Sequence, residues 1–226
     1  MPSIELLYAD AQVVIANKPS GLLVHRGWAN DDDVALFRVR DAVGAHVHPV
    51  HRLDRGTSGA LLFARTAEAA AVLARALEEG RIEKRYLALV RGAPEDAGVI
   101  DYAIPKSEGG PRVPAVTHFR RIARSSVDRC SLVLALPKTG RLHQVRRHLR
   151  HAGHPLIGDV NYGSGELNRH YRAAYGIHRL ALHAHSLAFD HPMTGVRVEV
   201  TAPVPDDLES GLGALGLATS AWSVAS

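Results

Sequence analysis

Short apolar runs of strand length recur along the whole chain, with few stretches of helical spacing between them. The runs lie at 4–8, 13–18, 59–65, 86–90, 98–104, 116–122, 131–136, 178–189 and 196–201. Apolar residues at helical spacing predict a helix at 67–77. Further helices are expected at 34–43 and at 143–152, where the turn at 139–140 opens the helix, and at most one short helix is expected after Pro205. Successive strands with so few helices favour an α+β fold on a mixed, mostly antiparallel sheet over a doubly wound parallel sheet.

The length of 226 residues fits one large domain or two small ones, and such a chain would bury roughly two-thirds of its unfolded surface without a disulfide or metal. We expect a main domain over residues 1–205 and a C-terminal helix or tail over 206–226. The single cysteine, Cys130, excludes an internal disulfide and cysteine-rich zinc motifs, and it suits a reducing cytosol. No apolar run has membrane-spanning length and no signal-peptide core begins the chain, so we expect a cytoplasmic protein without a membrane partner.

Basic residues are concentrated in one part of the chain. The formal net charge is only +4, but no carboxylate lies between Asp128 and Asp159. That stretch holds Arg129, Lys138, Arg141, Arg146, Arg147 and Arg150, together with His143, His148, His151 and His154. Such one-sided charge favours an anionic partner, with the phosphate backbone of a nucleic acid as the leading candidate. A solvated basic helix face is the alternative.

The densest polar stretch is residues 51–59, directly before the apolar run at 59–65. A loop that leads into a core strand is a rigid place to present a reactive group. Asp54 lies there with Arg52 and Arg55 on either side, and nearby positive charge keeps a carboxylate ionised and able to act as nucleophile or base. The alternative is a turn aspartate that accepts hydrogen bonds from backbone amides.

Two further residues are candidates for the same chemistry. Tyr86 opens a strand and could stack on a base or relay a proton, although a half-buried strand tyrosine is the commoner case. Arg146 lies in the expected basic helix beside an apolar stripe, where a guanidinium usually has a carboxylate partner. Asp54 is one candidate for that partner.

Metal and cofactor chemistry is not expected. His148, His151 and His154 are three residues apart and His183 and His185 alternate along a strand, but no cysteine accompanies them and Pro155 should end the helix. We therefore predict no metal site. We also predict no cofactor, because the chain has no glycine-rich phosphate-binding motif.

The stretch His51–Asp54, followed by Thr57–Gly59, resembles the signature of the RluA-type pseudouridine synthases. Other marks of that family occur in the family's order. They are Asn17–Gly21, Lys84–Tyr86, Thr139–Arg146, His154–Asp159 and Arg179–Ala184. The resemblance covers about residues 4–202 and implies an enzyme that isomerises uridine to pseudouridine in folded RNA. It also implies the α+β fold of these enzymes, with flanking helices and a central RNA-binding cleft.

The resemblance implies a role for each candidate. Asp54 matches the catalytic aspartate, Tyr86 the tyrosine that packs on the target base, and Arg146 the arginine that pairs with the aspartate. Arg52 matches the residue that enters the RNA and helps displace the target nucleotide, and Arg141 is expected to contact RNA. The target must leave its stack before the bond from uracil N1 to the ribose can be exchanged for one from C5.

The expected partner is RNA rather than DNA, and tRNA in particular. The stretches Lys18–Trp28 and Pro114–Arg120 are similar to one subgroup of the family, which modifies a tRNA uridine where the T stem meets the acceptor stem. The segment between Ile104 and Pro114 looks shorter than in that subgroup. The alternatives are an enzyme for ribosomal RNA, a non-catalytic RNA-binding protein with the same fold, and a metal-dependent hydrolase. A monomer is expected.

Overall fold

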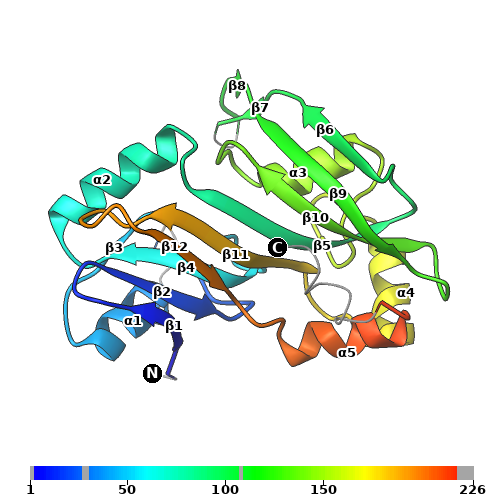
Figure 1. The fold of residues 1–226 in the computed structure, drawn as a ribbon. Coiled ribbons are helices and arrows are strands. Elements are labelled where there is room, and N and C mark those ends of the chain that lie inside the picture. Colours follow the sequence, from blue (N-terminus) through cyan, green and yellow to red (C-terminus); the bar gives the residue numbers. More distant parts are fainter. Residues whose placement is uncertain (1–2, 27–30, 107–108, 218–226) are drawn as a thin grey trace. The chain divides into compact units, whose positions relative to one another are not determined.

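The computed structural model describes residues 3–26, 31–106 and 109–217. These residues fall into two compact units (Figure 1). The first unit comprises Met1–Lys84 and Ala184–Pro203, and the second comprises Arg85–His183 and Val204–Ser226. Each unit is described by itself below.

A sheet and two helices form the first unit. Its strands are β1 (Glu5–Ala9), β2 (Val13–Lys18), β3 (His48–Pro49), β4 (Ser58–Ala64), β11 (Leu182–Asp190) and β12 (Arg197–Thr201). They are ordered β1-β2-β4-β11, with β3 paired to β4 and β12 paired to β11. The pairs β1–β2, β2–β4, β3–β4 and β11–β12 are antiparallel. Its helices are α1 (Ala35–Val43) and α2 (Ala67–Glu78).

Every residue of β4 is buried, which confirms the core strand expected at 59–65. Helix α2 begins where Thr66 Oγ1 accepts a hydrogen bond from the Ala69 amide, so one of the free N–H groups of the first turn is satisfied. Its buried face, with Leu73 at the centre, packs on side chains of β2 and β4. The loop that enters β4 is therefore anchored to the core of this unit.

The second unit contains an antiparallel sheet with helices on both faces. Its strands are β5 (Glu83–Arg91), β10 (Cys130–Pro137), β9 (Val116–Arg124) and β6 (Ala97–Asp101), in that order. A two-stranded ribbon of β7 (Ile104–Pro105) and β8 (Arg112–Val113) lies apart from them. Its helices are α3 (Gln144–His151), α4 (Gly165–Tyr175) and α5 (Asp206–Ala214).

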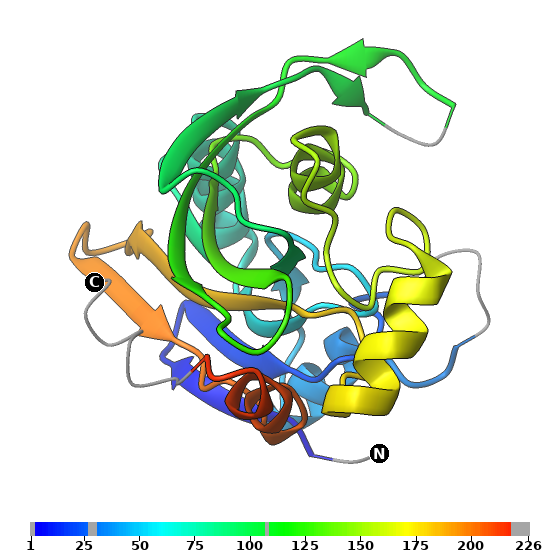
Figure 2. The ribbon, with the colours of Figure 1, turned by 90° about the vertical axis from the view of Figure 1, so that its right-hand side faces the viewer.

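Alternation along β5 divides the second unit into two cores. Leu87 and Leu89 pack with side chains of α4 and α5, which lie side by side in Figure 2. Ala88 and Val90 pack with side chains of α3. Both faces of this sheet are thus covered, and α3 holds a fixed position on one of them.

The α+β class and the mostly antiparallel pairing agree with the prediction. Helix α4 was not expected, although Ser164 caps it and Gly176 ends it in the left-handed conformation. Helix α5 matches the short helix expected after Pro205, and its Leu208 and Leu212 are buried in the second unit's core. The remainder of the expected tail, from residue 218, lies outside the described residues. None of the helices in the described ranges is long and apolar enough to cross a membrane.

Candidate active site

The segment that carries Asp54 leaves the sheet of the first unit at a defined point. Strand β3, which precedes this segment, pairs with β4 up to Pro49, which lies opposite Phe63. One residue later, the Val50 amide still donates a hydrogen bond to the Leu62 carbonyl at 3.1 Å. At the next step the imidazole of His51 takes over, because its Nε2 accepts the Leu62 amide at 3.2 Å. The His51 side chain thus takes the place of a backbone carbonyl as the acceptor of the Leu62 amide, and the main chain leaves the sheet before Asp54.

His51 can accept this hydrogen bond only as a neutral imidazole with its proton on Nδ1. Burial lowers the pKa of His51 to about 3, and the positive charge of Lys84 lowers it further in the same direction. The ring also hydrogen-bonds the backbone of Arg52. His51 is therefore a neutral clamp at the start of the loop, a role that we did not predict from the sequence.

The residues after Asp54 are held by the turn at 18–21. The Gly21 amide donates to the Arg55 carbonyl at 2.8 Å, and Arg55 Nε donates back to the Gly21 carbonyl at 2.9 Å. Ser20 Oγ donates to the Gly56 carbonyl at 2.8 Å. The loop is thus fixed on both sides of the aspartate.

Lys18 ties this turn together from inside. Its side chain is fully buried, and its ammonium donates to the carbonyls of Leu22 at 2.6 Å, Pro19 at 2.9 Å and Arg55 at 3.3 Å. Asp54 itself is partly buried, and its carbonyl accepts the Thr57 amide at 3.0 Å. A carboxylate on so constrained a loop is preorganised for chemistry.

In the second unit, Arg146 on α3 forms a buried ion pair with Asp159. Arg146 Nε and Nη2 donate to Asp159 Oδ2 and Oδ1, both at 2.8 Å. The amides of Asn161 and Tyr162 donate to Asp159 Oδ1 at 3.0 Å each. Burial alone would raise the pKa of Asp159, but these hydrogen bonds outweigh it and hold the pKa below its ordinary value.

Asp159 is thus a carboxylate partner of Arg146 that the sequence reading did not find. Asp159 is the last residue of His154–Asp159, one of the stretches that resemble the family. Its distance from Arg146 along the chain, however, does not indicate that the two side chains are in contact. The pairing of Arg146 with Asp54 expected from the resemblance stays a prediction.

Tyr162 gathers three basic side chains at the start of α3. Its hydroxyl accepts from Arg147 Nε at 2.8 Å and lies 3.0 Å from His143 Nδ1. The guanidinium carbons of Arg146 and Arg147 lie 4.9 and 5.3 Å from the centre of its ring. His143 has a positive φ of 50°, an uncommon conformation for a residue other than glycine.

Gln144 builds the turn that leads into α3. Its Oε1 accepts from Thr139 Oγ1 at 2.7 Å and from the Arg141 amide at 3.0 Å, while its Nε2 donates to Thr117 Oγ1 at 3.0 Å. Thr117 Oγ1 also lies 2.9 Å from Nδ1 of the fully buried His148. This network fixes the backbone of Arg141, whose side chain is partly exposed.

Tyr86 lies on β5 opposite Ala135 and is partly buried. Its ring packs against the core that includes Val145 and Leu149 of α3. The second unit therefore places Tyr86 on the sheet face that α3 covers, the helix that carries Arg146. Arg52 and Asp54 belong to the first unit, where Arg52 is exposed.

The histidines considered for a metal have structural contacts. His148 Nε2 lies 2.9 Å from the Tyr102 carbonyl, His151 stacks on Tyr102 with ring centres 3.5 Å apart, and His154 Nδ1 lies 3.0 Å from the Arg91 carbonyl. Burial lowers the pKa of His148, in keeping with a neutral core histidine. Across the described residues, no group of three or more His, Cys, Asp or Glu side chains could hold a metal ion.

Comparison with known proteins places this site in a family. A family model described as RNA pseudouridylate synthase matches residues 12–151. The tRNA pseudouridine synthase C of Yersinia pestis is 40% identical over 221 residues, which cover 88% of this chain and 86% of the relative. The protein of the same name from Haemophilus ducreyi is 39% identical over 219 residues, covering 88% of this chain and 90% of its own.

A solved structure agrees with these sequence relatives. Human RNA pseudouridylate synthase domain containing 1 is 29% identical and superposes with a TM-score of 0.76, over 92% of this chain and 87% of the human one. The stretch that the family model matches, residues 12–151, includes His51–Asp54, Tyr86 and Arg146. The chain therefore belongs to the RNA pseudouridylate synthase family, whose members isomerise uridine in RNA to pseudouridine.

Proposed function

We propose that this enzyme modifies tRNA, at uridine 65 where the T stem meets the acceptor stem. The support for tRNA is the similarity to relatives named tRNA pseudouridine synthase C, which extends over 86–90% of the length of the two compared above. The observation that carries the catalytic assignment is the loop of Asp54, held by His51 before the aspartate and by the 18–21 turn after it.

In this proposal Asp54, Tyr86 and Arg146 form the catalytic set. Asp54 is the carboxylate that acts on the ribose of the target uridine. Tyr86 offers a flat ring against which the detached uracil turns, so that C5 replaces N1 in the bond to the ribose. Arg146 supplies positive charge from a side chain that is only 6% exposed and oriented by Asp159. No cofactor or metal is included.

Two further arginines are assigned to RNA binding. Arg52 is exposed and lies two residues before Asp54. We propose that its side chain fills the space in the base stack that the flipped nucleotide leaves. Arg141 stands at the turn before α3, and its backbone is fixed by Gln144. We assign it to the RNA backbone.

The test is tritium release from RNA labelled at uridine C5, because formation of the new carbon–carbon bond expels that hydrogen. Bulk tRNA and ribosomal RNA are compared with the wild type, Asp54→Asn and Asp41→Asn. Asp41 is an exposed aspartate of the same unit, and its substitution is the matched control. We expect release from tRNA by the wild type and the control, and none by Asp54→Asn with tRNA binding retained.

Each other outcome has a distinct meaning. Release from ribosomal RNA alone would keep the reaction and reject tRNA as the substrate. Full activity of Asp54→Asn would reject the catalytic assignment. Binding of both RNAs without release by the wild type would favour an RNA-binding protein that kept the fold.

We also propose that the enzyme acts in the cytoplasm as a monomer. Within the described ranges, the large apolar side chains that are exposed lie mostly on separate elements, whereas a subunit interface needs a contiguous apolar patch. They are Val72, Val99, Val127, Val160, Met193 and Val196. Light scattering on the purified protein should give a mass near 24.4 kDa, and a mass of twice that value would reject the monomer.

A further inference from the structure

Tyr162 lies in the loop between α3 and α4 and contacts three basic side chains through two different parts of its own. Its hydroxyl accepts from Arg147 Nε at 2.8 Å and lies 3.0 Å from His143 Nδ1. The guanidinium carbons of Arg146 and Arg147 lie 4.9 and 5.3 Å from the centre of its ring, within the range of a cation–π interaction. The hydroxyl therefore holds Arg147 and His143, whereas Arg146 is held by the ring alone.

The position of Tyr162 is fixed by the carboxylate that also holds Arg146. Asp159 Oδ1 accepts the Tyr162 amide at 3.0 Å and Arg146 Nη2 at 2.8 Å. The Asp159 carbonyl accepts the Gly163 amide at 3.0 Å, and a Cβ on Gly163 would lie 2.4 Å from that carbonyl oxygen. The backbone next to Tyr162 therefore has little freedom, and the ring stays beside Arg146.

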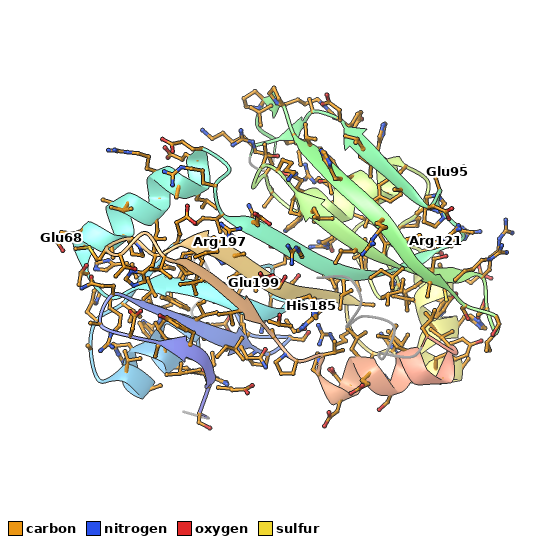
Figure 3. The ribbon with its side chains drawn as sticks, viewed as in Figure 1. Glu68, Glu95, Arg121, His185, Arg197 and Glu199 are labelled. Carbon is orange, nitrogen blue, oxygen red and sulfur yellow. The ribbon has the colours of Figure 1, made fainter. Side chains whose placement is uncertain are left out.

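A tyrosine orders these cations without cancelling their charge. Arg121 of β9, which is labelled in Figure 3, shows the alternative, because it is paired with the carboxylate of Asp96. Arg147 forms no ion pair with a carboxylate in the part of the chain that the structure describes, and the phenol oxygen of Tyr162 holds it instead. Its guanidinium thus keeps a full charge with which to attract a phosphate.

We propose that Tyr162 is a positioning residue with two separable tasks. Its hydroxyl orients Arg147 toward a phosphate of the RNA, and its ring braces Arg146, which the proposed function makes catalytic. Tyr162 acts through these two arginines and takes no part in the chemistry. The inference rests on the proposed function and adds to it the residue that links RNA binding to the catalytic arginine.

Tyr162→Phe and Tyr162→Leu separate the two tasks, because phenylalanine keeps the ring and leucine keeps neither part. Equilibrium titration with tRNA and the kcat of tritium release are measured for each. Tyr162→Phe should weaken tRNA binding between about twofold and tenfold and leave kcat unchanged, since only one hydrogen bond to Arg147 is lost. Tyr162→Leu should weaken binding as well and also lower kcat by about tenfold or more, because Arg146 loses its brace.

Tyr175→Phe is the matched control, because Tyr175 is a partly buried tyrosine of α4 in the same unit. It should leave both tRNA binding and kcat unchanged. Thermal denaturation of all three variants measures the cost to the fold separately. A purely structural role for Tyr162 would lower the melting temperature and leave the kcat of the folded enzyme the same in Tyr162→Phe and Tyr162→Leu.

The action of the hydroxyl through Arg147 is tested by combining Tyr162→Phe with Arg147→Ala. If the hydroxyl serves only to orient that guanidinium, its removal has nothing left to affect once Arg147 is gone. The double variant should therefore bind tRNA as weakly as Arg147→Ala alone, and the two losses should not add.

Three results would overturn the proposal. They are unchanged tRNA binding in Tyr162→Phe, equal kcat in Tyr162→Phe and Tyr162→Leu, and additive losses in the double variant. Failure of the tRNA assignment is seen separately, as release by the wild type from ribosomal RNA alone. The Tyr162 comparison would then be made on that RNA.

Discussion

The carboxylate of Asp159 faces the guanidinium of Arg146 edge to edge, with both of its oxygens 2.8 Å from an arginine nitrogen. Such two-point pairing fixes the plane of the guanidinium as well as its position. Asp159 also accepts hydrogen bonds from the backbone amides of Asn161 and Tyr162, which fix its carboxylate in place. The position of Arg146 is therefore fixed by the turn that holds Asp159. A proposed catalytic residue on α3 is thus oriented from the loop that follows the helix.

Removal of Asp159 should therefore damage both stability and turnover. Asp159→Ala leaves a buried guanidinium without this partner, which should lower the free energy of unfolding by about 3–5 kcal/mol. Urea denaturation measures that loss. The remaining folded protein should show a lower kcat for tritium release, since the orientation of Arg146 is lost.

The matched control is Asp41→Ala, which breaks the exposed pair with Arg40 at 2.7 Å. Its cost should stay below about 1 kcal/mol, because solvent screens an exposed pair. Equal losses in the two variants would contradict the role given to Asp159.

Features that repeat along the chain were predictable from the sequence. The buried strand β4, the helix α2 with its Thr66 cap and the strands around β10 follow from local patterns of apolar residues. The resemblance of His51–Asp54 to the family signature then indicates Asp54 as the catalytic carboxylate. The α+β class follows from the order of these elements, which is a property of the chain itself.

Contacts between distant side chains were not predictable in the same way. Tyr162 and Asp159 meet the α3 arginines 13–15 residues away, and His51 bonds to an amide 11 residues away. No periodicity encodes such pairs, because they depend on where loops return to the core. Helix α4 was missed because its few buried residues, Asn168 and Tyr171, leave only a weak apolar stripe.

Gly158 should be irreplaceable, because its backbone has a positive φ of 76° and a Cβ there would lie 1.8 Å from the Arg179 carbonyl. Gly153 has a similar φ of 84° with nothing within 4 Å of the same position. Gly153→Ala should therefore cost about 1 kcal/mol of conformational strain. Gly158→Ala should cost several times more in thermal denaturation, and similar costs would contradict the steric argument.

Stability should fall as the pH drops below about 6.5, and His51 should account for part of the fall. Its pKa is about 3 in the folded protein and about 6.5 when unfolded, so the unfolded state binds more protons between these values. The contribution of His51 is complete above pH 6.5 and is reduced by about 2 kcal/mol at pH 5. Urea denaturation as a function of pH should show this slope, with a further share from His148.

His51→Gln tests that assignment, because a glutamine oxygen can accept the Leu62 amide and does not titrate. The variant should lose part of the pH slope and keep stability at pH 7. His51→Leu should lose the slope too, but the unsatisfied amide should cost about 1–3 kcal/mol at pH 7. An unchanged slope in both variants would show that His51 is not the titrating group.

Arg147 should bind an RNA phosphate, because its side chain is only partly buried and Tyr162 holds it through Nε. Arg147→Ala should weaken tRNA binding and lower the slope of log affinity against log salt by about 0.7–0.9, which corresponds to one lost phosphate contact. Tyr162→Phe should weaken binding less, because the charge remains and only its orientation is lost. Arg75→Ala, on an exposed position of α2, is the control and should leave the slope unchanged. An equal change in Arg75→Ala would mean that the salt dependence reports the overall charge of the protein instead of a contact at α3.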